Sequence, residues 1–353
     1  MIRRVQLSLN EANAGKLHKL DLVMTESMRV LNDYVDVLWA GRSISKFTPI
    51  DRDTWLSARM RQCLLKQAAE TVKSQRALGG GTKPSVTGRT LNLDERFLKI
   101  TDGGNTFDLW IRFASLGDKI RMSLPACKHK HMLKYSNAGW AMRKSGRLRH
   151  NSKGWFLDIY MEKVQPAFRT SGTEIGLDTG YRKLLACSDG KIYDAGLPAV
   201  YTKITRRRRG STAYARALSE RDQLINRSVN SIDLTGVKTL VVENLKSVKH
   251  KSKGRFLKEF NSKLAHWSYP GVLNKLQLAC EERGINFIKV DPAYTSQTCS
   301  SCGRVDGESR KGETFRCTGC GMLMDADINA AKNILMRGTY SPPSVKTSHE
   351  IPF

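Results

Sequence analysis

The sequence predicts an α+β protein of more than one domain, and three patterns along its 353 residues support this. Apolar residues recur every three or four positions over 17–38 and 56–72, which is typical of amphipathic helices. Short stretches typical of strands fill 91–165. After Pro166, apolar strands alternate with helical stretches, and paired cysteines follow. A chain of this length can hold two or three domains with a substantial core.

The charge balance indicates a polyanionic partner. Lys and Arg number 59 against 33 Asp and Glu, which gives a formal charge of +26. Such a surplus favours phosphate binding, with a membrane surface as the rival partner. No apolar run approaches the length of a spanning helix, and the start MIRRVQLSLN lacks the apolar core of a signal peptide. We therefore expect a cytoplasmic, nucleoid-associated protein with no membrane partner.

The N-terminal half reads as a helical hairpin set into a small antiparallel sheet or barrel. Residues 2–10 alternate like a strand, and the second helical pattern ends at the glycines 79–81. Residues 119–157 contain no Asp or Glu. A solvated face is the alternative, but an uncompensated run of cations favours a phosphate-tracking surface. The cations are Lys119, Arg121, Lys128, Lys130, Lys134, Arg143, Lys144, Arg147, Arg149 and Lys153.

Three carboxylates lie at the ends of apolar elements. Asp178 and Glu243 each end an apolar strand, and Asp327 begins the last helix on its apolar face, with Asp325 as the N-cap. Separately they could open a turn, end an exposed strand and favour a helix N-terminus. Together they can converge on one cleft and hold two divalent cations about 4 Å apart around a scissile phosphate. Carboxylate oxygens suit Mg²⁺, or Mn²⁺ in its place.

Four cysteines form a C-x2-C-x14-C-x2-C pattern through Cys299, Cys302, Cys317 and Cys320. Two such pairs close a tetrahedron of thiolates, so the pattern predicts a structural Zn²⁺ site. Redox disulfides are the alternative, and they would require an oxidising compartment. The remaining cysteines are single and read as core or surface thiols.

Several stretches together resemble the TnpB (OrfB) proteins of insertion sequences, which are relatives of the type V CRISPR effectors. They are GLDTG, VVENL, TSQTCSSCG, CTGCG and DADINAAKNIL, and they occur in the family's order within 166–336. The N-terminal half matches the family only in its general pattern of strands with a helical insert, without specific motifs. The resemblance implies a β-barrel wedge domain with a helical recognition insert, then an RNase H-like (RuvC) α/β nuclease domain with an inserted zinc ribbon.

The resemblance also implies domain boundaries. We expect a wedge domain over 1–10 and 86–166, a recognition insert over 11–85, a RuvC-like domain over 172–294 and 321–337, a zinc-binding target-nucleic-acid module over 295–320, and a disordered tail over 338–353.

The implied activity is RNA-guided cleavage of double-stranded DNA beside a short motif that the protein reads. Asp178, Glu243 and Asp327 take the catalytic, magnesium-binding positions. The partners are a transposon-derived guide RNA and target DNA, with one protein monomer on one RNA. The chain would come from a prokaryote or phage.

Further residues are expected to contact nucleic acid. Arg206, Arg207, Arg208 and Arg209 would begin a helix that runs along it. Thr295, Ser296 and Gln297 offer hydroxyl and amide groups to substrate, with strand-to-turn capping as the alternative. Lysines complete the set, namely Lys246, Lys249, Lys251 and Lys253.

Three other functions remain open at this point. A repressor would use the same scaffold without cutting, although none of the three acids is lost. A DNA-strand transferase would use the same three-acid chemistry. A miniature type V CRISPR effector would differ by a repeat array beside its gene.

Overall fold

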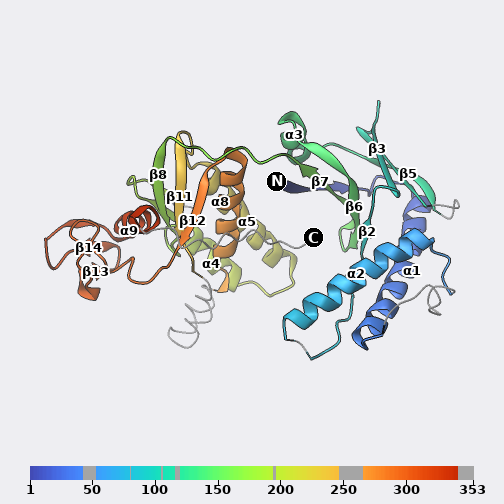
Figure 1. Cartoon of the computed structure of the whole chain (residues 1–353), viewed down its shortest axis with the longest axis horizontal. Coiled ribbons are helices and arrows are strands. Elements are labelled where there is room, and N and C mark those ends of the chain that lie inside the picture. Colours follow the sequence, from blue (N-terminus) through green and yellow to red (C-terminus); the bar gives the residue numbers. More distant parts are fainter. Residues whose placement is uncertain are drawn as a thin grey trace. The chain divides into compact units, whose positions relative to one another are not determined.

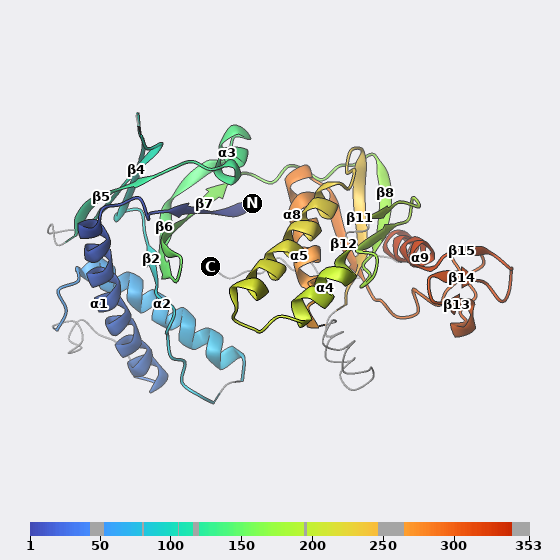
Figure 2. The same ribbon diagram turned by 180° about the vertical axis from the view of Figure 1, so that it is seen from behind.

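The computed structural model describes residues 1–42, 53–79, 81–104, 106–115, 120–193, 196–245 and 265–340. The chain divides into two compact units, Met1–Val164 and Gln165–Phe353 (Figures 1 and 2). Lys119, Lys246, Lys249, Lys251 and Lys253 lie outside the described residues. Among the residues that are described, no helix is long and apolar enough to cross a membrane.

Two long helices in unit 1 confirm the helical patterns. Helix α1 spans Ala14–Trp39 and helix α2 spans Ala58–Ala77. Each begins at a side-chain cap, Asn13 for α1 and Ser57 for α2, whose oxygen accepts a backbone N–H of the first turn. Their apolar stripes are buried in the core of the unit. The two helices pack against each other and lie between β1 and β2 in the chain.

The strands of unit 1 form two antiparallel sheets. One has the order β1-β7-β6-β2 and the other β3-β4-β5. Their bounds are β1 Ile2–Ser8, β2 Thr90–Leu93, β3 Leu98–Asp102, β4 Leu109–Ala114, β5 Arg121–Ala126, β6 Ala141–Asn151 and β7 Gly154–Glu162, with helix α3 at Lys130–Asn137. The expected strands are therefore present as two separate sheets, and their closure into a barrel stays a prediction.

Unit 2 is built on a five-stranded sheet of order β10-β9-β8-β11-β12, in which β8, β11 and β12 are parallel. The bounds are β8 Thr173–Asp178, β9 Leu185–Cys187, β10 Ile192–Tyr193, β11 Val237–Glu243 and β12 Asn286–Val290. The helices are α4 Leu197–Thr205, α5 Thr212–Asn230, α8 Tyr269–Arg283 and α9 Ala326–Tyr340.

Alternating side chains direct different helices to the two faces of this sheet. Leu177 and Val242 point into a core shared with α4, α5 and α8. Gly176 and Val241, one position earlier, face α9. A Cβ at Gly176 would lie 2.2 Å from the backbone oxygen of Ala331. The absence of a side chain at Gly176 therefore lets α9 pack directly onto the middle of β8.

A small ribbon interrupts unit 2 between β12 and α9. It contains a short 3-10 turn, Gly307–Ser309, and three antiparallel strands, β13 Arg310–Lys311, β14 Thr314–Arg316 and β15 Leu323–Asp325. Its own small core gathers Cys299, Phe315, Cys317 and Ala326. The ribbon is thus held by a few apolar side chains and its cysteines.

The prediction that Arg206–Arg209 begin a helix is wrong. Helix α4 ends at Thr205, and α5 begins at Thr212 with Ser211 as its N-cap. The four arginines form the exposed turn between the two helices. Gly210, with a φ of 82°, breaks the helical path, and mutual repulsion of adjacent cations disfavours the compact helical spacing.

The predicted tail from 338 is also corrected at its start. Helix α9 continues to Tyr340, and residues 341–353 lie outside the described part. Gly338 lies against Val241, where a Cβ would come within 2.5 Å of the valine methyls. The helix therefore still packs on the sheet at Gly338, the first residue of the predicted tail.

We expect Gly176→Ala to destabilise unit 2, because its methyl group would overlap backbone atoms of α9. Overpacking of this kind costs about 1–3 kcal/mol, which lowers the melting temperature by about 2–12 °C. Gly307→Ala is the matched control, since a Cβ there meets nothing within 4 Å. Differential scanning calorimetry of both variants measures this, and equal melting temperatures would contradict the packing argument.

Candidate active site and metal centre

The three carboxylates predicted from the sequence come to one edge of the unit 2 sheet. Asp178 ends β8 and Glu243 ends β11, and these strands are parallel neighbours with Leu177 opposite Val242. Carboxyl ends of parallel strands meet at the same sheet edge. Asp327 lies in the first turn of α9, which packs on β8. Asp178 and Asp327 line a common cleft of about 400 Å³.

The acids are close enough to affect one another's protonation. Burial raises the pKa of Asp178 well above its usual range, and the charges of Glu243 and Asp327 raise it further. Burial also raises the pKa of Glu243. Carboxylates packed together in this way repel each other unless a cation or a proton intervenes. Carboxylate oxygens are the hard donors that Mg²⁺ prefers, and a Mg²⁺ site at these acids stays a prediction.

Glu243 is held by two buried hydroxyl groups. Thr295 donates its hydroxyl to Glu243 Oε1 in a short hydrogen bond. Tyr269 donates to the Glu243 carbonyl at 2.8 Å and accepts the Leu245 N–H at 2.7 Å. Glu243 itself is only 7% exposed. Its backbone and its side chain are therefore both fixed before any substrate is bound.

In the 295–297 turn, Thr295 differs from its expected role as a substrate contact, whereas contacts by Ser296 and Gln297 stay predictions. Thr295 is 2% exposed and bonds to Glu243, so it acts as a support for the acid and is turned away from solvent. Ser296 is half-buried, whereas Gln297 is exposed and its N–H donates to the Tyr294 carbonyl. The Thr295 hydroxyl also lies 3.0 Å from the Pro292 carbonyl, so the capping alternative describes Thr295.

Two cations that sequence reasoning missed lie against Asp327. Arg310, on ribbon strand β13, donates to Asp327 Oδ1 at 2.8 Å. Lys183, in the turn after β8, lies 3.8 Å from Asp327 Oδ2 and 2.5 Å from Asp325 Oδ2. Both oxygens of Asp327 thus face a positive charge. Nothing in the sequence separates these two cations from the other Lys and Arg residues, because only the fold brings them here.

The start of α9 confirms the predicted cap and adds a second anchor. Asp325 Oδ1 accepts the N–H groups of Asp327 and Ile328 at 3.0 and 3.2 Å. One turn later, Asn329 donates to the Thr298 carbonyl, and Asn333 donates to the carbonyls of Thr295 and Thr298. The same helix therefore carries Asp327 and fixes the turn that supports Glu243.

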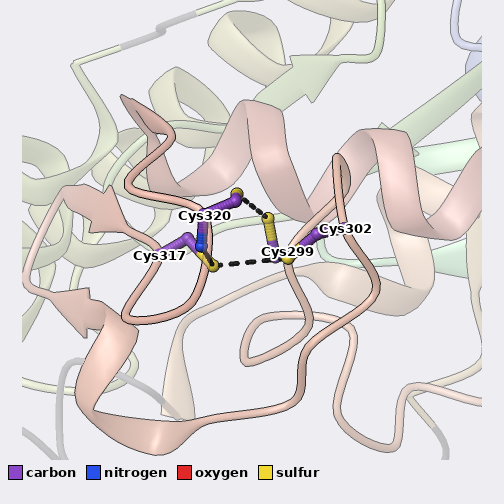
Figure 3. Close-up of side chains that lie close together, drawn as sticks. All are labelled: Cys299, Cys302, Cys317 and Cys320. Atoms are coloured by element: carbon purple, nitrogen blue, oxygen red, sulfur yellow. Dashed lines mark hydrogen bonds between the residues drawn. The ribbon is translucent and has the colours of Figure 1, made fainter.

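The four paired cysteines form a compact cluster (Figure 3). Their sulfur atoms all lie within 4.8 Å of one another, with 3.7 Å between Cys299 and Cys320 and 3.6 Å between Cys302 and Cys317. Thiolates 2.3 Å from a tetrahedral Zn²⁺ are about 3.8 Å apart, whereas disulfide sulfurs are about 2.0 Å apart. The geometry therefore fits Zn²⁺ and does not fit the disulfide alternative.

Backbone groups of the second knuckle favour a thiolate. The N–H groups of Cys320 and Gly319 point at Cys317 Sγ from 3.4 and 3.3 Å. They lower the pKa of Cys317 to about 6, led by the Cys320 N–H. Burial instead raises the pKa of Cys299 to about 11. A bound cation is needed to hold both sulfurs as thiolates at neutral pH.

Comparison with known proteins agrees with this geometry. The Cas12f1-like TNB domain model matches residues 269–334. Cas12f1 of Sulfoacidibacillus thermotolerans, a CRISPR-associated endodeoxyribonuclease, is 47% identical over 72 residues, which are 20% of this chain and 17% of that protein. TnpB-like protein L79 of Acanthamoeba polyphaga mimivirus is 33% identical over 95 residues, 27% of this chain and 18% of that protein.

A longer match extends over half of the chain. InsQ of Escherichia coli (strain K12), named as an RNA-guided DNA endonuclease, is 28% identical over 217 residues, 52% of this chain and 54% of InsQ. The chain is thus similar to TnpB/Cas12f-like proteins along about half of its length. Its matches span about half or less of the length of these curated relatives. Their whole-protein activities therefore remain proposals for this chain.

Solved structures share the fold of this TnpB/Cas12f-like chain. A Cas12f1–sgRNA–target DNA complex aligns with a TM-score of 0.59 at 16% identity, over 91% of this chain and 83% of that one. The mini-RNA-guided endonuclease CRISPR-Cas_phi3 aligns with a TM-score of 0.57 at 10% identity, over 96% and 92%. At these identities the likeness concerns the fold, and it supports a mixed α+β multidomain architecture.

Cys317→Ser should remove zinc from this TnpB/Cas12f-like chain and destabilise the ribbon, because three thiolates leave the tetrahedron open. Inductively coupled plasma mass spectrometry of the purified protein should find about one zinc per wild-type chain and far less in the variant. Cys127→Ser is the control, since Cys127 is exposed and outside the cluster. Unchanged zinc content in the Cys317 variant would rule out this site.

Asp178→Asn should raise the thermal stability of the protein in magnesium-free buffer at neutral pH. The folded pKa of Asp178 lies above its unfolded value. The contribution of Asp178 to the free energy of unfolding is therefore present below about pH 4 and is lost as pH rises through the folded pKa. Asparagine does not ionise, so the variant avoids this loss of stability, which is about 1.4 kcal/mol for each unit by which folding raises the pKa.

Melting temperatures measured between pH 4 and pH 8 check the sign. The difference between variant and wild type should grow with pH and shrink when Mg²⁺ is added to the wild type. Asp233→Asn is the control, because a backbone hydrogen bond from Thr235 lowers the pKa of Asp233. A pH-independent difference for Asp178→Asn would contradict the repulsion argument.

Proposed function

We propose that the chain is an RNA-guided, divalent-metal-dependent endonuclease that cleaves double-stranded DNA with one RNase H-like (RuvC-like) site. The observation that carries this proposal is the meeting of Asp178, Glu243 and Asp327, from β8, β11 and α9, at one sheet edge. InsQ, named as an RNA-guided DNA endonuclease, and Cas12f1, named as a CRISPR-associated endodeoxyribonuclease, support it. The formal charge of +26 suits a protein that holds both RNA and DNA.

The protein groups divide the work at the cleft. Divalent cations held by the three carboxylates would activate water and stabilise the leaving oxygen of the phosphodiester. Thr295 and Tyr269 keep Glu243 oriented. Arg310 lines the same cleft and would neutralise the scissile phosphate once Asp327 turns to the cations. Lys183 would remain with Asp325 and hold the helix start in place.

The rest of the chain would bind the guide and the target. In this proposal the wedge (1–10 and 86–166) and its helical insert (11–85) hold the transposon-derived guide RNA and read the motif beside the target. The nuclease parts (172–294 and 321–337) flank the zinc module (295–320), which holds target DNA. The exposed turn Arg206–Arg209 adds a cationic contact. Base pairing with the guide would select the target sequence.

The first test is to purify the protein from its native genetic context and sequence the RNA that copurifies. One discrete RNA ending in a variable segment would establish guidance and define a target. Heterogeneous RNA, or none, would favour the strand-transferase or repressor functions. A repeat array beside the gene would identify a CRISPR effector.

Asp178→Ala should abolish cleavage while leaving RNA and target binding largely intact, because the carboxylate acts on the cations and not on the bases. We expect a loss of at least about 10³-fold in the cleavage rate, as for a group that acts in the transition state. Asp189→Ala, in the turn after β9, is the control and should cut normally. Retained cutting by Asp178→Ala would refute the assigned role.

A further inference from the structure

Tyr294 has a backbone conformation that tyrosine rarely adopts. Its φ is 61°, the one positive φ at a non-glycine residue within the described part of the chain. In this left-handed region the Cβ of a bulky residue crowds the following carbonyl oxygen, so glycine or asparagine is usual there. Such outliers persist where surrounding contacts determine them, and they cluster at functional sites.

The contacts that hold this turn come from its backbone and from α9. The Tyr294 carbonyl accepts the N–H groups of Gln297 and Thr298, both at 3.0 Å, and the Thr298 hydroxyl at 2.8 Å. Asn333 binds the carbonyls of Thr295 and Thr298. None of these bonds involves the Tyr294 side chain, so a glycine in this position would form the same turn without strain.

Most of the Tyr294 side chain lies at the surface, and none of the hydrogen bonds that hold the turn uses it. It is 63% exposed, and among the described residues no ring stacks on it and no group hydrogen bonds to its hydroxyl. The chain therefore keeps a strained backbone and exposes a large aromatic surface. Folding explains the turn, but it does not explain the tyrosine.

The position of the turn indicates what the ring meets. Thr295, the next residue, bonds directly to Glu243. Arg337 donates to the Asp291 carbonyl at 2.8 Å, at the start of the same loop, and its charge acts on Glu243. An exposed aromatic ring thus lies one residue from the group that holds Glu243, and a fixed cation is near enough for its charge to act on that acid. This pairing is typical of surfaces that bind single-stranded nucleic acid.

We propose that Tyr294 is a stacking platform for an unpaired nucleobase of the strand whose backbone enters the carboxylate cleft, with Arg337 facing its phosphate. The choice of this strand rests on the proposed nuclease function. A rigid turn places the ring without the entropy cost of ordering a mobile loop. Stacking needs only the π-face of a base, so the platform would hold any sequence in register with the scissile phosphate.

Photocrosslinking gives a local readout that other cationic surfaces do not obscure. The full-length protein would be irradiated with a short single-stranded oligothymidine carrying one 5-iododeoxyuridine, in magnesium-free buffer. This base couples to aromatic rings stacked on it. We expect the adduct at Tyr294, in the tryptic peptide Val290–Arg304. An adduct confined to other peptides would overturn the proposal.

Substitutions separate the ring from the turn. Tyr294→Phe should keep the adduct, whereas Tyr294→Gly should lower the yield in this peptide at least about fivefold, the effect of losing one stacked base. Tyr294→Gly should melt no lower than wild type, because the strain is relieved. A lower melting temperature would instead show that the ring packs structurally and would overturn the proposal.

Phe168→Ala is the matched control, since Phe168 is a similarly exposed aromatic, 58% exposed, in the same unit. The Phe168→Ala variant should bind the oligothymidine and form the adduct at Tyr294 as the wild type does. The assay needs no cleavage, so its result is independent of whether the acids cut DNA. An adduct at Tyr294 in a protein that never cleaves would support the stacking platform and reject the nuclease function. Cleavage without an adduct at Tyr294 would support the nuclease function and reject the platform.

Discussion

The close packing of α9 on β8 is the constraint on which the site depends. Because Gly176 has no side chain, the backbone of α9 packs directly on β8, and this packing determines the position of Asp327 relative to Asp178. Further along the same helix, Asn329 and Asn333 bind the turn that follows β12. One helix therefore determines the position of an acid, of the turn supporting a second acid, and of the base of the ribbon.

Electrostatics explain why the ribbon is joined so closely to the cleft. Three acids at one sheet edge repel one another, and burial makes this repulsion costly. Arg310 reaches Asp327 only because β13 pairs with β14 and β14 with β15, the strand that runs into α9. Glu313, in the turn between β13 and β14, lies 3.4 Å from Lys183. The ribbon thus supplies a cation to an acid of α9 and an acid to a cation that follows β8.

Sequence patterns predicted those features that a single element determines. The acids at strand ends, the Asp325 cap and the cysteine spacing each follow from local rules, and the structure gathers them as expected. Thr295 was misassigned because its burial depends on Glu243, which is distant in sequence. Nothing in the sequence indicated the role of Arg310 and Lys183, because the acid that each cation contacts is determined by the tertiary fold. The arginine turn was misread because periodicity does not register Gly210.

The cysteine cluster and the carboxylate cleft are then not independent. The ribbon has a very small apolar core, so its fold depends on the cysteine cluster and the cation that the cluster fits. If that fold is lost, Arg310 leaves Asp327, and the cleft loses a positive charge that offsets its acids. Loss of the cysteine cluster would therefore change the electrostatics of the carboxylates without any contact between the two sites. A cluster placed between β12 and α9 in this way helps to assemble the cleft, which explains why so short a linker joins the last cysteine to Asp327.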